Sequence, residues 1–106
     1  DIIGRFHGGW HGGLDGFLEE HPDRRGIPKD INNLFKVLPY NDDKCFEQIT
    51  SELAAIIIEP VQGSNPRDDI KPFLQKLRDR CDKVGVLLIF DEVLDYHIKV
   101  VLVYLM

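Results

Sequence analysis

Two short apolar runs, each ending on a carboxylate, flank an amphipathic segment and constrain the fold of this chain most strongly. The runs are Ala54–Ile58, followed by Glu59, and Val86–Phe90, followed by Asp91. Branched apolar runs of this length are typical of strands buried on both faces, as in a parallel sheet covered by helices. Between them, apolar residues recur at helical spacing from Asp69 to Val84. Strand, helix and strand in this order predict a right-handed βαβ unit with parallel strands.

The ends of the predicted helix carry residue types that begin and terminate helices. Asp68 or Asp69 can cap its N-terminus, and Pro72 falls in the first turn, where the amide has no intrahelical partner. Gly85 is placed to terminate the helix in a left-handed conformation. We therefore expect the two strands to be parallel neighbours, or separated by a single strand, with this helix packed on their sheet.

Glu59 and Asp91 come directly after the two strands. Because the strands are predicted to be parallel, both carboxylates are expected at the same edge of the sheet, where ligands bind in open α/β folds. An ionised aspartate at the rim of a buried strand needs a cationic partner or several hydrogen-bond donors to offset its desolvation. The sequence therefore predicts a ligand site at this edge, with a positive group facing Asp91.

The rest of the chain supplies shorter elements. Ile2–Phe6 is predicted to be a strand, and Leu34–Leu38 is extended. Residues 41–43 offer N-cap oxygens to a short helix whose apolar residues face the core. The polar stretch 14–33 is predicted to be a surface loop with one helical turn around residues 17–20.

The loop after the first strand reads HGGWHGG, and its four glycines let the backbone approach a ligand closely. His7 and His11 are four residues apart, which on a helix would suit a metal ion. The glycines between them disfavour a helix, and no glutamate accompanies them as in the zincin motif, so no metal site is predicted. Trp10 is either an aromatic residue held by packing or a stacking surface for a ligand.

Size, charge and cysteine content exclude several classes of protein. The 106 residues form at most one domain, with 43% hydrophobic residues, enough for a modest core. A net charge of -5 argues against a surface for nucleic acids or anionic membranes. Cys45 and Cys81 lack CxxC spacing, which indicates a reduced pair in a cytoplasmic protein. No apolar stretch reaches the roughly 20 residues of a membrane span.

The chain supplies little cover for the sheet that it predicts. Two buried strands need helices on both faces, yet the sequence holds one long amphipathic helix and an apolar tail, Val100–Met106, without a turn or a partner. Such a sheet exposes strand edges and an apolar patch, both of which favour association. We therefore expect the chain to be part of something larger.

Four motifs occur here in the order in which class III aminotransferases carry them, and the chain resembles that family over residues 2–93. The motifs are GGWHGG around His11, LPYND at 38–42, IIIEPVQG at 56–63 and LLIFDEV at 87–93. The resemblance implies a fold-type I transferase that uses pyridoxal 5′-phosphate (PLP), similar to the glutamate-1-semialdehyde aminomutase branch. The fold class is then α/β, part of the mostly parallel, helix-covered sheet of the large PLP-binding domain, in agreement with the βαβ pattern.

The resemblance implies a role for Asp91 that supplies the positive group expected above. Asp91 matches the aspartate that pairs with the pyridinium nitrogen of PLP and keeps it protonated, so that the ring serves as an electron sink. Val93, two residues on, resembles the apolar residue under the ring.

Four further residues match cofactor-binding positions of the family. Trp10 falls where the family has Tyr or Phe stacked on the other face of the ring, and His11 belongs to the same motif. Gln62 matches a Gln near the phenolic oxygen of the cofactor. Glu59 aligns with a glutamate beside the site, although an exposed carboxylate or a helix-cap partner is an alternative for it.

The chain departs from the family in three places. The Schiff-base lysine lies farther beyond the aspartate than this sequence extends, and nothing around Lys99 resembles its motif. The phosphate-binding turn has no counterpart, and residues 94–106 form an apolar tail that does not match, so 1–93 is the expected part of the transferase domain. The parent enzyme is expected to be a homodimer that acts on an amino acid or amine and an oxo-acid acceptor, whereas this chain alone is expected to be inactive.

Two other functions stay open at this point. Apolar residues followed by Asp-Glu also resemble the Walker B motif of P-loop ATPases, but no GxxxxGK[ST] motif occurs. A non-catalytic α/β interaction module is the second alternative.

Overall fold

The computed structural model of the chain describes residues 1–9, 11–12, 26–60 and 69–92. The elements in order are β1 (Ile2–Phe6), α1 (Lys29–Asn32), β2 (Phe35–Leu38), the 3₁₀ helix η3 (Asp43–Gln48), β3 (Leu53–Ile58), α2 (Lys71–Val84) and β4 (Leu87–Phe90). Among the described residues, no helix is long and apolar enough to cross a membrane.

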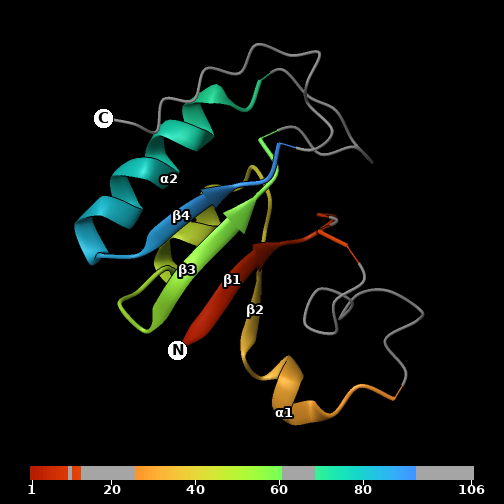
Figure 1. Cartoon of the computed structure of the whole chain (residues 1–106). Helices are drawn as coiled ribbons and strands as arrows, with labels where there is room; N and C mark the ends of the chain where they lie inside the picture. The colour runs from red at the N-terminus through yellow and green to blue at the C-terminus, as the bar shows by residue number, and fades with distance from the viewer. Residues whose placement is uncertain (10, 13–25, 61–68, 93–106) are drawn as a thin grey trace.

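The described strands form one sheet in the order β2-β1-β3-β4, and all three neighbouring pairs are parallel. In Figure 1 the arrows of β1, β3 and β4 accordingly run the same way, with α2 alongside β4. The register pairs Ala55 with Leu87 and Ile58 with Phe90. The prediction that the two apolar runs are parallel neighbours joined through an amphipathic helix is therefore confirmed.

The core lies between the sheet and the two elements that cover it, α2 and η3. The strands contribute Phe6, Leu38, Ile56 and Ile58, each at most 1% exposed. The covering elements and the segments beside them contribute Cys45, Ile49, Phe73, Leu77 and Cys81. Side chains of a strand alternate between the two faces of a sheet, and Ile56 and Ile58 of β3 accordingly both enter this core.

The opposite face of β4 is not covered by the described residues, which corrects one expectation. Val86–Phe90 was expected to be buried on both faces, but Leu87 is 63% and Ile89 is 40% exposed. The physical reason is that β4 is an end strand of the described sheet and α2 packs on one face only. The predicted lack of cover is confirmed at these two residues.

The helix α2 ends as the sequence predicts but begins differently. Gly85 adopts a φ of 78°, and its amide donates to the Cys81 carbonyl. Pro72 lies in the first turn, also as expected. The N-cap residue is Ile70, with no side-chain cap hydrogen bond, so the prediction of capping by Asp69 is wrong. The other candidate, Asp68, lies outside the described residues.

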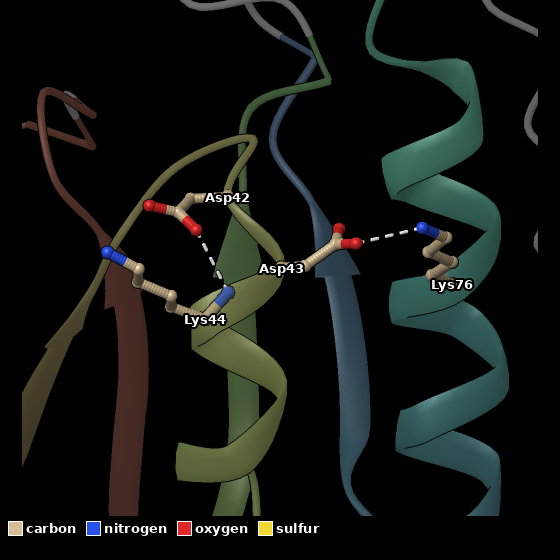
Figure 2. Close-up of polar contacts among 4 residues, drawn as sticks. All are labelled: Asp42, Asp43, Lys44 and Lys76. Atoms are coloured by element: carbon tan, nitrogen blue, oxygen red, sulfur yellow. Dashed lines mark hydrogen bonds and ion pairs between the residues drawn. The ribbon is translucent and has the colours of Figure 1, made fainter.

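The short helix η3 begins at the polar cluster that the sequence indicates. The Asp42 side chain accepts a hydrogen bond from the Lys44 amide at 2.9 Å, and Asp43 pairs with Lys76 of α2 at the same distance (Figure 2). The Lys76 and Asp43 side chains are 57% and 67% exposed, so their ion pair contributes little to stability. It nevertheless marks where η3 and α2 meet.

The segment before β2 contains an element that the sequence did not indicate. The turn expected at residues 17–20 lies outside the described residues, whereas α1 at Lys29–Asn32 begins directly after Pro28. Proline fixes the backbone dihedral that precedes a helix, and a single turn of four residues leaves no periodic pattern to detect. The extended segment expected at 34–38 is confirmed as β2, which begins one residue later at Phe35.

Substituting Gly85 tests the left-handed helix end. A Cβ at this position meets nothing within 4 Å, so Gly85→Ala introduces backbone strain without a clash. We expect a loss of about 1 kcal/mol in the free energy of unfolding, measured by urea denaturation. Asn tolerates the left-handed region, so Gly85→Asn should recover much of the loss. Equal stability of the Ala variant and the parent chain would contradict this role.

The two cysteines are free and fully buried in the core. Burial raises the pKa of the Cys45 thiol to about 12, with the nearby carboxylates of Asp42 and Asp43 adding to the effect. Burial likewise raises the pKa of the Cys81 thiol to about 11. Both thiols therefore stay protonated in the folded chain at a pH where an unfolded chain loses their protons.

This difference predicts a pH dependence of stability. Because the pKa values are raised from 9.0 in the folded state, the stabilisation is present below pH 9 and is lost as the pH rises toward 11. The slope is at most about 1.4 kcal/mol per pH unit for each thiol. Urea unfolding from about pH 8 to 10.5 measures how the free energy of unfolding changes with pH. The same measurement on a Cys45→Ala/Cys81→Ala chain gives the contribution of the other titrating groups. Parallel pH profiles of the two chains would refute the prediction.

Candidate functional site

The candidate site lies at the carboxyl ends of β3 and β4, where the sheet presents two carboxylates. Glu59 and Asp91 follow the paired residues Ile58 and Phe90. The Asp91 amide donates to the Ile58 carbonyl at 2.8 Å, which extends the strand pairing by one bond. The prediction that both carboxylates emerge at the same edge is confirmed.

Asp91 receives its hydrogen bond from a residue 80 positions away in the sequence. His11 Nδ1 lies 2.8 Å from Asp91 Oδ2, and the two side chains are 2% and 16% exposed. A carboxylate only accepts, so Nδ1 carries the proton in this pair. The strand β1 makes the contact possible, because it lies beside β3 and delivers the glycine-rich loop to the same edge of the sheet.

Glu59 is buried, with 4% exposure, and lies close to the same imidazole. The position beside Gly9 gives the evidence for this. A Cβ atom added to Gly9 would lie 3.2 Å from His11 Nε2 and 3.5 Å from Glu59 Oε1. The same Cβ would lie 3.2 Å from the Phe6 carbonyl oxygen. The imidazole Nδ1 thus faces Asp91, while its Nε2 and Glu59 Oε1 both approach the same point beside Gly9.

Tyr40 contacts the backbone directly after β3. Its hydroxyl donates to the Glu59 carbonyl at 2.9 Å and lies 3.3 Å from the Pro60 carbonyl. The Tyr40 ring packs edge-on against Phe6, with the ring centroids 5.9 Å apart. The LPYND segment is therefore attached to the end of β3 at one side and to the core at the other.

Three of the six cofactor-binding residues expected from the sequence come together in the described residues: Asp91, His11 and Glu59. The alternative of an exposed Glu59 is wrong. The other three, Trp10, Gln62 and Val93, lie outside the described residues, as does Lys99. The sequence indicated that Asp91 needs a hydrogen-bond donor. The contact of His11 with Asp91 and the hydrogen bonds of Tyr40 to the backbone after β3 do not follow from the spacing of these residues in the sequence.

The arrangement can hold a cationic group. His11 occupies one oxygen of Asp91, and the carboxylate keeps 16% of its surface exposed at the sheet edge. An anionic acceptor of this kind stabilises a protonated ring nitrogen or an amine. In the part of the chain that the structure describes, no group of three or more His, Cys, Asp or Glu side chains is arranged to bind a metal ion.

Comparisons with known proteins agree on one family. A family model described as "Aminotransferase class-III" matches residues 3–94. Glutamate-1-semialdehyde 2,1-aminomutases of Clostridium perfringens and Clostridium tetani are each 41% identical over 108 aligned positions, covering 89% of this chain and 25% and 26% of their own lengths. A crystal structure of an omega-transaminase from Sphaerobacter thermophilus matches with a TM-score of 0.73 and 31% identity, covering 88% of this chain and 26% of that chain. The chain thus spans about a quarter of the length of these relatives.

Removing the carboxylate tests how strongly the His11–Asp91 pair stabilises the fold. Asp91→Ala takes the acceptor from a buried imidazole N–H, and we expect a loss of about 1.5–3 kcal/mol in the free energy of unfolding. Asp43→Ala is the matched control, because it breaks an exposed pair expected to contribute less than about 1 kcal/mol. Urea denaturation measures both variants. Equal losses would show that the buried pair adds nothing beyond a surface contact.

Proposed function

Since this chain belongs to the class-III aminotransferase family, whose model matches residues 3–94, we propose that it forms the cofactor-facing edge of a PLP-dependent aminotransferase or aminomutase. The observation that carries the proposal is the Asp91 carboxylate held by His11 at the carboxyl end of a parallel strand. The family match also removes the reason to interpret LLIFDEV as a Walker B motif.

The chemistry of the donor set fits the cofactor. A protonated pyridine nitrogen needs an anionic acceptor in surroundings that exclude most water, and Asp91 supplies one with a partly exposed carboxylate. When bound, PLP supplies an electron sink for charge that develops at the substrate Cα. Asp91 would hold the proton on the ring nitrogen, and His11 would fix the orientation of that carboxylate through its Nδ1–H.

The remaining site residues enter the proposal through the family resemblance. Trp10 and Val93 would lie on the two faces of the ring, and Gln62 would lie near its phenolic oxygen. Glu59 matches the family's glutamate beside the site and would line the cofactor site next to His11. A stacked aromatic ring and an apolar residue would hold the cofactor plane in place and exclude water from it.

Substrate, assembly and location belong to the same proposal. We infer an amino acid or amine substrate with an oxo-acid acceptor, a homodimeric complete enzyme and a cytoplasmic location, the last in keeping with the two free cysteines. The relatives include both named aminomutases and a transaminase. Either reaction is consistent with Asp91, because both require a stabilised charge at the substrate Cα.

A chimaeric enzyme provides the decisive test. Residues 3–92 replace the matching segment of the Clostridium perfringens aminomutase, and Asp91→Asn is then introduced. The Asn variant should retain PLP by absorbance but lose turnover by about 100-fold or more, because each lost unit of ring-nitrogen pKa elevation corresponds to about 1.4 kcal/mol. Asp43→Asn, at the exposed pair, is the control and should retain turnover. Near-normal turnover of the Asp91→Asn chimaera would rule out the role of Asp91.

A second test uses the chain by itself. Because no residue here matches the lysine motif of the family, we propose that the chain alone does not catalyse amino transfer. Mixing it with PLP, reducing with borohydride and mapping the labelled lysines should show scattered, substoichiometric labelling. A single stoichiometric adduct on Lys99, together with transaminase turnover, would overturn this expectation.

A further inference from the structure

The LPYND segment has no part in the chemistry proposed above, yet its tyrosine contacts the site. The Tyr40 hydroxyl lies 2.9 Å from the Glu59 carbonyl oxygen and 3.3 Å from that of Pro60. Two consecutive carbonyls thus converge on one donor, immediately after β3 ends at Ile58. A hydroxyl placed in this way fixes the direction in which the chain leaves the strand.

The core in turn fixes the position of the hydroxyl. The Tyr40 ring lies 5.9 Å from the Phe6 ring and 6.2 Å from the Phe73 ring, measured between centroids. Phe6 belongs to β1 and Phe73 to α2, and both side chains are at most 3% exposed. Close-packed aromatic rings have little freedom to shift, so the phenol cannot follow the carbonyls if they move.

Glu59 is part of the surroundings of the imidazole. Its side chain is buried, and its Oε1 approaches the point beside Gly9 that His11 Nε2 also approaches. A rotation of the Glu59–Pro60 peptide would move this carboxylate relative to the ring. The His11–Asp91 hydrogen bond is made by Nδ1, the other nitrogen of the same ring, so a displaced imidazole would lengthen it.

We propose that Tyr40 is a positioning residue of this site. Its hydroxyl fixes the Glu59–Pro60 backbone and thereby the position of the His11 imidazole relative to Asp91. The functional importance of that imidazole position rests on the proposed function, whereas the coupling between Tyr40 and His11 does not. Tyr40 acts through the two backbone carbonyls that its hydroxyl contacts.

The test is Tyr40→Phe in the full chain, observed through the side-chain NMR signals of His11. The substitution removes only the hydroxyl and retains the ring that packs on Phe6. We expect the exchange of the His11 Nδ1 proton to become about fivefold faster or more, with a shift of the imidazole ¹⁵N signals, because the hydrogen bond to Asp91 loosens. No cofactor is present, so this outcome is independent of the chimaera test of Asp91.

A matched control separates positioning from loss of stability. Phe46 stacks on Phe73 at 5.4 Å, in the same aromatic cluster, and no hydrogen bond connects its side chain to the site. Phe46→Leu should lower stability while leaving the His11 signals unchanged. If Tyr40→Phe lowers stability but leaves the exchange rate of the Nδ1 proton unchanged, the proposal is overturned.

A second measurement applies if Tyr40→Phe fails to fold. The chain has three tyrosines, so a Tyr96→Phe/Tyr104→Phe background allows 3-fluorotyrosine to be placed at Tyr40 alone. Fluorine makes the phenol a stronger donor while retaining the ring and the hydroxyl. The proposal requires a shift of the His11 imidazole signals relative to the unfluorinated chain, and identical signals would overturn it.

Discussion

The site depends on the parallel pairing of β3 with β4. Parallel strands place their carboxyl ends at one edge, and here a hydrogen bond from the Asp91 amide to the Ile58 carbonyl continues the pairing past the last strand residue. That bond keeps the backbone of Asp91 beside the end of β3, next to Glu59. The central position of β1 then brings His11 to the same place, because a strand beside β3 must end at the same edge.

Much of this arrangement follows from local patterns in the sequence. The apolar runs, the helical periodicity between them and Gly85 predict the βαβ unit, and the structure confirms it because each pattern reports a strong local preference. The N-terminal cap of α2 and the turn α1 did not follow. Isoleucine is not a residue type that predicts a helix N-cap, so the start of α2 at Ile70 could not be predicted. A four-residue helix is too short to show the periodic spacing of apolar residues that predicts a helix.

The site itself could be predicted only in part. Placing Glu59 and Asp91 at one edge required only that their two strands run parallel, which a βαβ pattern predicts. Asp91 and His11 are 80 residues apart in the sequence, so no local pattern indicates their hydrogen bond. The hydrogen bonds of Tyr40 go to backbone carbonyls, which every residue carries, so the residue types in the sequence do not indicate them. The sequence predicted that the sheet lacks cover but not that Leu87 and Ile89 are the exposed residues, since an apolar run does not reveal which of its faces is covered.

The long span of the His11–Asp91 contact has a consequence for the order of folding. The β3–α2–β4 unit closes over a short stretch of chain, whereas joining His11 to Asp91 closes a loop of about 80 residues, at a higher cost in chain entropy. Contacts between residues close in sequence form earlier on average than distant ones. The imidazole should therefore reach its carboxylate late, after the sheet has formed, so that among the contacts of the described residues the one on which the proposed function depends forms late.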